Sequence, residues 1–565
     1  MLMPICPMLQ AVSCHIIGAY SLHALDKAKQ SACRKRHLVG VNERGCRNGL
    51  PRYGKPPKNN YMQAKTAQSS KLSLSQINDA LFTLKDGASL AVFRISIGIL
   101  VLIDIAKGYP FYDSHEFKAS YYGFSWVKAD PTLIGAFEFL LPITALLVTV
   151  GFLYRIAMPV TALMAAYFFL IAPANYLNHY YMLVLFLILL SVVPAHRAWS
   201  VDAYLNKRRN KDDSGIPYWS YLLLKLQTEI ILIYAGLVKI NYDWLQLQPI
   251  GTWLRLESYG TPFQWLFYFN LPIIIGAYGV ILLHVIGAPL LFYKKTRIWI
   301  FALYVCFHYT NSQMFDIGIF PYMTVAATLL FFAPDWPRQF AGKMLRLKTP
   351  SYPTDKHAPK NKWVLPACTL WLTWQALNPL PALIAPNLQV AWRGHGDAFT
   401  WRMMLNDRRI FDLKFVAYIP KENTIEFIDM REHMGERQCF MTAWKPNATV
   451  QFAHYLDTKL QEKYKTDDVQ IHAYITLGIN GREGELWADP TKDLSTYEVK
   501  YGTYDWQTYA TKPLRGWKEM ANTPRHQSPA YKDVLKEMKL PTTETIILNS
   551  DSASLDAPLE KSRCH

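Results

Sequence analysis

Long apolar stretches recur along the first two thirds of the chain, separated by short polar connections. A bilayer core about 30 Å thick needs roughly 20 apolar residues per helix, and fewer where polar groups face a protein interior. On this measure the sequence predicts about nine transmembrane helices. They cover residues 90–107, 131–152, 156–173, 180–195, 217–238, 272–292, 297–310, 317–334 and 363–384. The seventh stretch is short and is also compatible with a re-entrant segment.

Basic residues between these stretches predict how the helices are oriented. Connections rich in Lys and Arg, which hold Arg155, 207–209, 294–297 and 338–362, alternate with connections poor in both. Because cytoplasmic loops carry the excess of Lys and Arg, this alternation puts the basic N-terminus in the cytoplasm. Nine spans then put the C-terminus outside. We expect a multi-pass integral membrane protein of a bacterial inner membrane, or of the endoplasmic reticulum in a eukaryotic host.

The composition changes after residue 385. The runs IEFIDM, TVQFAHYL and VQIHAYITLGI alternate or are rich in β-formers, with Gly and Asn between them, whereas VQFAHYLDTKLQEKY is also typical of an amphipathic helix. We therefore expect a helical membrane domain over 81–385 and a mixed α/β, β-rich extracytoplasmic domain over 386–545. Residues 1–80 are basic and aperiodic and are expected to be a disordered extension, and 546–565 a loose tail.

Charge and motifs exclude several classes of function. The 565 residues carry a net charge of +17, but the basic residues lie beside apolar stretches, where they set membrane topology. Since no zinc-finger spacing or RNA-binding signature appears, we expect a lipid bilayer and no nucleic acid as partners. The eight cysteines form no C-x-x-C site and indicate no disulfide framework. The chain also lacks a Gly-rich phosphate loop, a nucleophile elbow and an H-E-x-x-H motif.

Lys239 is the first candidate for chemistry, because ionisable groups at membrane spans are costly. It lies at the outer end of the fifth stretch, in IYAGLVKINYDW. One interpretation is a lysine that snorkels to the interface. The other is a catalytic base, since burial lowers a lysine pKa and a neutral amine can take a proton from a phenol-like group.

Two histidines lie at the depth predicted for Lys239. His179 opens the fourth stretch and His308 closes the seventh, so we expect a pocket shared by the three groups. They lack the spacing and the carboxylates of a metal site, and we expect no metal. Within the fifth stretch, Lys225 and Glu229 are four residues apart and are expected to form a structural ion pair.

A series of sequence blocks resembles one enzyme family. The blocks are DGASLAVFRISIGILVLIDI, GFLYRI, LNHYYM, IPYWSYLLLKLQ with AGLVKINYDW, FHYTNSQMFDIGIFPY, FAPDWPR and FTWRMML, in that order. Over roughly residues 80–500 the chain resembles the vitamin K-dependent gamma-glutamyl carboxylases, in the form of a bacterial-type homologue. Each block alone is weak evidence, whereas the ordered set is specific.

The resemblance implies an enzyme that uses reduced vitamin K, O2 and CO2, without a metal. It would convert glutamate in a protein or peptide substrate to gamma-carboxyglutamate and form vitamin K epoxide. Lys239 matches the lysine held to deprotonate the hydroquinone, and His179 matches a histidine needed for carboxylation. The quinol-pocket candidates are Asn178, His308 and Asn311, and the glutamate-binding candidates are Trp401 and Arg408.

The chain also departs from the family pattern. The loop 109–130 has no cysteine, so a family disulfide to the C-terminal domain cannot form there and Cys439 is left without that partner. Asn406 stands where the family has a histidine. Two alternatives therefore stay open. One is vitamin K epoxidation without carboxylation, and the other is a non-enzymatic membrane binding or transport protein on the same scaffold.

Overall fold

The computed structural model describes residues 73–108, 115–209, 215–346, 356–519, 526–541, 545–548 and 554–559. The chain divides into two compact units, Met1–Thr83 and Leu84–His565. In the first unit, helix α2 (Leu74–Phe82) starts with a capping box in which Ser73 and Gln76 satisfy each other's backbone N–H groups. The disorder predicted for 1–80 is therefore wrong for the residues of α2, and residues 1–72 lie outside the described part.

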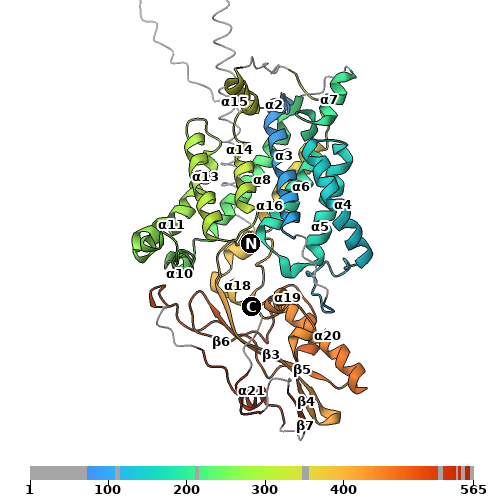
Figure 1. The fold of residues 1–565 in the computed structure, drawn as a ribbon, viewed down its shortest axis with the longest axis vertical. Helices are drawn as coiled ribbons and strands as arrows, with labels where there is room; N and C mark the ends of the chain where they lie inside the picture. Colours follow the sequence, from blue (N-terminus) through green and yellow to red (C-terminus); the bar gives the residue numbers. More distant parts are fainter. Residues whose placement is uncertain are drawn as a thin grey trace, which may run out of the picture. The chain divides into compact units, whose positions relative to one another are not determined.

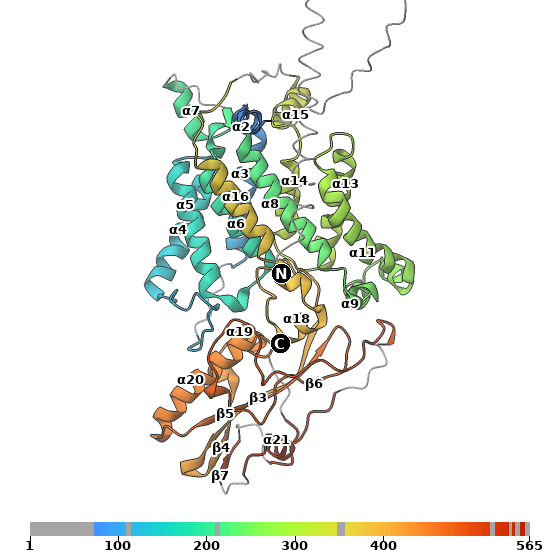
Figure 2. The same cartoon turned by 180° about the vertical axis from the view of Figure 1, so that it is seen from behind.

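The second unit begins with a bundle of apolar helices, which Figures 1 and 2 show lying side by side. The helices are α3 (Ala88–Ala106), α4 (Pro131–Val150), α5 (Tyr154–Ile171), α6 (Asn178–Val192), α8 (Tyr218–Leu237), α11 (Asn270–Leu282), the π-helical η4 (Leu283–Gly287), α12 (Ala288–Leu290), α13 (Arg297–Met314), α14 (Phe320–Leu329) and α16 (Val364–Leu377). Shorter helices are α7 (Val201–Arg208), α9 (Tyr242–Leu245), α10 (Ile250–Glu257), α15 (Trp336–Leu345), α17 (Leu380–Ile384) and α18 (Asn387–Arg393).

Five of the described helices are long and apolar enough to cross a bilayer. They are α3, α4, α5, α8 and the continuous stretch Asn270–Leu290, while α6 and α14 are apolar but shorter. A helix covers each of the stretches predicted from the sequence, and a helical membrane region is confirmed. The number of nine spans stays a prediction, because length and composition alone qualify fewer helices.

Two buried cations of the bundle, Arg94 and Lys225, lie against backbone carbonyls or aromatic rings. The Arg94 guanidinium of α3 is fully buried and donates to the carbonyls of Ala195, Thr149 and Trp199. This guanidinium therefore satisfies carbonyls near the ends of neighbouring helices, which lack partners within their own helix.

The ion pair expected between Lys225 and Glu229 of α8 is not formed. Lys225 Nζ lies 5.6 Å from the Tyr218 ring and 5.9 Å from the Phe331 ring. Glu229 Oε1 is buried without a hydrogen-bond partner. The prediction is wrong because the long lysine stem extends toward the aromatic rings at the start of α8 rather than along the helix toward Glu229.

The C-terminal part of the second unit is a mixed α/β domain built on a five-stranded sheet. The strands are β3 (Arg408–Ile419), β4 (Thr424–Phe427), β5 (Gln470–Ile479), β6 (Glu485–Leu486) and β7 (Thr545–Ile547), in the order β6-β5-β3-β4-β7. All neighbours are antiparallel except β4 and β7. The helices α19 (Glu436–Thr442) and α20 (Pro446–Tyr464) share a core with β3 and β5, and α21 (Tyr531–Met538) packs on β4. A small ribbon of β1 (Leu84–Asp86) and β2 (Gly215–Pro217) lies in the helical region.

This domain confirms the expected α/β mixture and corrects several details. IEFIDM overlaps β4 and VQIHAYITLGI contains β5, whereas TVQFAHYL belongs to α20, as its amphipathic pattern predicts. The tail predicted to be loose over 546–565 is wrong for its described residues, since β7 pairs with β4 and Leu559 is buried. Cys439 is disulfide-bonded, so the expectation that it is left without a partner is wrong.

Replacing Arg94 by Met tests its role in closing the bundle. We expect the free energy of unfolding to fall by about 3 kcal/mol, because each carbonyl left without a donor costs roughly 1–3 kcal/mol. Arg155→Met, at an exposed position of α5, is the matched control and should change little. Thermal unfolding in detergent measures both, and equal midpoints would contradict the role of Arg94.

Candidate active site

Lys239 lies two residues beyond the end of α8, and its side chain is buried. Its Nζ donates to the carbonyl of Ala235 at 3.0 Å and to the carbonyl of Met403 at 2.9 Å. The Trp244 ring lies 5.1 Å from the same nitrogen. Among the described residues no carboxylate pairs with this amine. The snorkelling interpretation is therefore wrong for Lys239, which points into the protein.

The surroundings of Lys239 favour its uncharged form. Burial, and after it the positive charge of Arg402, lowers the pKa of Lys239 to about 7. Carbonyl oxygens accept hydrogen bonds without the full negative charge that would stabilise an ammonium group. A large fraction of the amine is thus free at neutral pH to accept a proton, as a general base requires.

The carbonyl of Met403 belongs to a strained loop between α18 and β3. Phe399, Trp401 and Met404 all have left-handed backbones, with φ of 63°, 57° and 47°. Such residues cost about 1–3 kcal/mol each and persist where the surroundings enforce them. Trp401 is fully buried and stacks on Tyr181 of α6 at 4.8 Å, with its Nε1 lacking a hydrogen-bond partner. The sequence cue for this loop was the block FTWRMML, which does not reveal its backbone.

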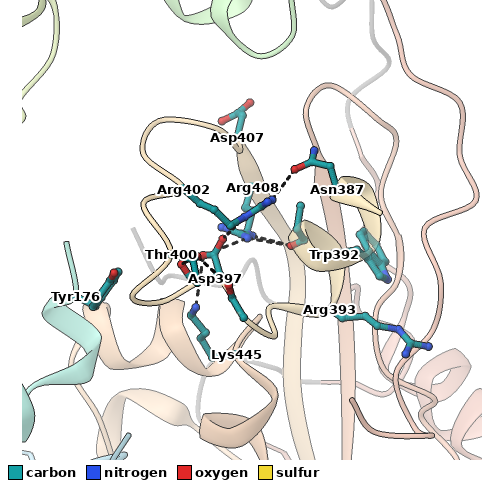
Figure 3. Close-up of polar contacts among 12 residues, drawn as sticks. Tyr176, Asn387, Trp392, Arg393, Asp397, Thr400, Arg402, Asp407, Arg408 and Lys445 are labelled. Atoms are coloured by element: carbon teal, nitrogen blue, oxygen red, sulfur yellow. Dashed lines mark hydrogen bonds and ion pairs between the residues drawn. The ribbon is translucent and has the colours of Figure 1, made fainter. Parts of the chain in front are cut away.

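Three cations surround Asp397, a carboxylate that belongs to this loop (Figure 3). Arg402, Arg408 and Lys445 lie 3.2, 3.6 and 3.5 Å from the carboxylate oxygens of Asp397. Burial alone raises the pKa of Asp397, but the three cations together hold it well below its usual value. Burial lowers the pKa of Lys445 to about 8. The group therefore has one negative charge and an excess of positive charge in a mostly buried place.

Both arginines of this group have a further contact that fixes them. Arg402 Nη2 donates to Asn387 Oδ1 at 2.7 Å. Arg408 donates to the carbonyl of Ala391 at 2.9 Å, and its guanidinium lies 3.8 Å from the Trp444 ring. The arrangement is typical of a preformed binding place for an anion, since excess cations held in a low dielectric attract a second negative group. The family resemblance indicates Arg408, whereas no local motif in the sequence connects Asp397, Arg402 and Lys445 to it.

His179 and Asn178 begin α6. A Cβ atom on Gly318 would lie 3.4 Å from His179 Nε2, and Gly318 has a left-handed backbone with φ of 56°. Asn178 Oδ1 accepts from the Tyr176 hydroxyl at 3.1 Å, and that hydroxyl accepts from the Phe399 N–H at 2.6 Å. Asn178 is thus connected to the loop of Trp401. Within the described part of the chain no hydrogen bond or ring contact joins His179 to Lys239.

His308 on α13 is buried, and neither of its ring nitrogens has a hydrogen-bond partner. Its ring stacks on Tyr304 at 6.0 Å and meets Phe320 edge-on at 5.6 Å. Asn311, one turn further along α13, is half-buried, and its carbonyl caps the helix by accepting from Phe315. His308 therefore offers unsatisfied polar atoms in an otherwise aromatic wall, whereas Asn311 shows only a backbone role in the described structure.

His284 is a residue that sequence analysis missed. It lies on the π-helical η4, and its Nδ1 contacts the carbonyl of Val280 at 2.8 Å. Its ring meets Tyr304, and a Cβ on Gly236 would lie only 2.8 Å from His284 Cβ. His284 thus joins the wall of His308 to the last turn of α8. The available cue was a histidine inside an apolar stretch, and single π-turns are frequent at functional sites.

Among the residues that the structure describes, no group of three or more His, Cys, Asp and Glu side chains is arranged to hold a metal ion. The site instead consists of the buried Lys239 amine and the buried imidazoles of His284 and His308, which lie beside aromatic rings. The cationic group around Asp397 adjoins it through Arg402. The fold and the site define a membrane protein whose helical region and C-terminal domain both contribute to one polar centre.

Comparison with known families identifies this class more closely. Residues 82–336 match the HTTM domain, and residues 360–512 match the lumenal domain of vitamin K-dependent gamma-carboxylase. No solved structure matches the chain significantly. The chain belongs to the vitamin K-dependent gamma-glutamyl carboxylase family. It is a membrane protein with an extracytoplasmic domain, while the orientation of its termini stays a prediction.

Replacing Gly318 by Ala tests the placement of His179. The left-handed backbone should cost about 1–2 kcal/mol, and the added methyl group would lie 3.4 Å from His179 Nε2, at the short limit of van der Waals contact. Gly123→Ala is the matched control, because Gly123 has a φ of 80° and open space around it. In thermal unfolding we expect Gly318→Ala to lose more stability than Gly123→Ala. Equal losses would show that His179 is not packed against this turn.

Proposed function

We propose that the chain carboxylates glutamate side chains of a protein or peptide substrate, using reduced vitamin K, O2 and CO2, and forms vitamin K epoxide. The observation that carries the proposal is the Lys239 amine, buried between two carbonyls without a carboxylate partner. Family membership suggests an enzyme of this kind and implies reduced vitamin K. The specific reaction is the proposal.

Lys239 and the aromatic wall of His308, which His284 connects, suit a hydroquinone, which carries phenol-type hydroxyls on an apolar ring. An uncharged amine can accept a hydroxyl proton, and the two unpartnered nitrogens of His308 can bond to a polar ligand atom. Tyr304, Phe307 and Phe320 supply apolar rings around that histidine. With O2, the bound reduced vitamin supplies a base much stronger than any side chain, which the weakly acidic γ-hydrogen of glutamate requires.

The cationic group around Asp397 suits the carboxylate of the substrate. Asp397 leaves Arg402, Arg408 and Lys445 with an excess of positive charge, and Arg402 acts electrostatically on Lys239 as well. The unpartnered Nε1 of Trp401 is a further donor on the same loop. These contacts support a substrate side chain held between the extracytoplasmic domain and the amine, with His179 as a candidate for the carboxylation step.

The direct test is incubation of membranes containing the chain with a glutamyl peptide, reduced vitamin K and labelled CO2. Lys239→Met should lower the incorporation of label at least about 100-fold, as expected for loss of a general base. Lys225→Met is the matched control, since it replaces another buried lysine about four turns earlier in α8. It should stay within about twofold of the unchanged chain. Incorporation that survives Lys239→Met would contradict the proposal.

The pH dependence gives a second test. Only the uncharged Lys239 can accept a proton, and its pKa of about 7 places the change between the two forms near neutrality. The rate should therefore rise with pH and fall about tenfold per pH unit well below the midpoint. Rates measured from acid to alkaline pH should give a midpoint near 7. A midpoint near the ordinary lysine value of about 10.4 would exclude Lys239 as the base.

Epoxidation without carboxylation is the second candidate, and Asn406 favours it. This residue stands where the family pattern has a histidine, and its Oδ1 is buried without a hydrogen-bond partner. A substrate side chain would thus meet a changed contact while the surroundings of Lys239 are unaffected. Measuring epoxide and labelled CO2 in the same reaction separates the two candidates, because epoxide without label supports the second.

A further inference from the structure

A buried ion pair connects the extracytoplasmic domain to the segment that follows Lys239. Arg482 donates to both carboxylate oxygens of Asp243, with Nη1 to Oδ2 at 2.7 Å and Nη2 to Oδ1 at 2.8 Å. Asn480 Nδ2 donates to Oδ2 at 2.8 Å. Both charged side chains are only 4% exposed. We call Asp243, Asn480 and Arg482 the clamp.

On the membrane side, the clamp holds the short helix α9. Asp243 lies in α9 between Asn241, which caps the helix by accepting from the Trp244 N–H at 3.1 Å, and Trp244 itself. Trp244 donates from its ring nitrogen to the carbonyl of Ala277 at 2.9 Å and faces Lys239 Nζ. Because Lys239 lies in the short connection between α8 and α9, the position of Asp243 fixes the path of the backbone at Lys239.

On the domain side, the clamp holds the strained loop. Asn480 forms a turn with φ of 51° after β5 and exchanges two hydrogen bonds with Asp407, both at 2.8 Å. Asp407 ends the loop whose Met403 carbonyl accepts from Lys239 Nζ. The turn at Asn480 therefore contacts both segments that hold Lys239. It reaches the Lys239 backbone through Asp243 and the Lys239 amine through the loop of Met403.

The energetics favour a role in positioning. Burying two charges costs several kcal/mol per ion, and well-packed apolar residues often serve stability equally well. A bidentate pair with a third donor instead fixes one geometry. Since Arg482 neutralises Asp243, the clamp acts on Lys239 through the backbone. The charged and titratable groups that act on the amine itself are Arg402 and His284.

We propose that Asp243, Arg482 and Asn480 are positioning residues that keep the Lys239 amine between its two carbonyls and away from water. The inference rests on the proposed function, in which this amine is the base. If the clamp is broken, α9 and the loop separate, water reaches the amine, and the ammonium form becomes favoured. At pH 7, a rise of one unit in the pKa of Lys239 lowers the uncharged fraction about fivefold.

The test measures the amine itself, so it does not depend on carboxylation. The purified full-length chain in detergent micelles is labelled by reductive methylation with isotopic formaldehyde at a series of pH values, and mass spectrometry follows the initial rate at Lys239. The midpoint of this profile reports the pKa of the amine. For Asp243→Asn we expect the midpoint to move up by about one unit or more. Asn480→Ala, which removes one donor and is the milder change, should move it in the same direction by less.

Gln451→Ala is the matched control. Gln451 exchanges hydrogen bonds with Ser120 and so also joins the two regions, away from Lys239. It should leave the midpoint unchanged. The inference is overturned if Asp243→Asn and Asn480→Ala keep the midpoint of the unchanged chain, or if Gln451→Ala shifts it equally. A shifted midpoint in a chain without carboxylation would support the clamp while contradicting the proposed function.

Discussion

The site depends on how a lysine amine is buried without an acid beside it. Two carbonyls hold Lys239 Nζ, one from the preceding turn of α8 and one from the loop of the C-terminal domain. A carbonyl binds the amine hydrogens and leaves the uncharged form accessible, whereas a carboxylate would fix the ammonium form. These two contacts of Lys239 Nζ depend on several parts of the fold. They are the end of α8, the left-handed residues of the loop and the placement of Trp244.

The polar centre combines two environments with opposite needs. Around Lys239 the charge is kept low, while around Asp397 three cations gather. Arg402 belongs to both, because it pairs with Asp397 and its charge lowers the pKa of Lys239. A site that holds an anionic side chain next to an uncharged amine needs its cations kept apart from that amine. The two environments come from different regions of the chain, and the connections between these regions are therefore part of the site.

The sequence was sufficient for the parts that local patterns encode. Apolar stretches located the helices, the amphipathic period located α20, and an ionisable group at a membrane span indicated Lys239. The ordered blocks also indicated the family that the domain matches identify. Trp401 lies inside the block FTWRMML and Arg408 three residues beyond it, and their role in binding glutamate stays a prediction.

The remaining features depend on contacts between distant residues. The carbonyl of Met403 has no signature because every residue carries one, and the π-turn at His284 leaves no local pattern. Asp243 and Arg482 are separated by 239 positions. The predicted ion pair between Lys225 and Glu229 is wrong for a different reason, because here a local pattern was present but did not decide the structure. Its spacing was right, but the aromatic rings around Lys225 decided where the side chain lies.

The most direct test of this account is an experimental structure of the chain in a lipid nanodisc with reduced vitamin K, or a non-reactive analogue, bound. We expect a ring hydroxyl oxygen within hydrogen-bond distance, about 3 Å, of Lys239 Nζ, with the amine still facing Met403. A ligand bound elsewhere, with Lys239 turned toward headgroups or open water, would contradict it.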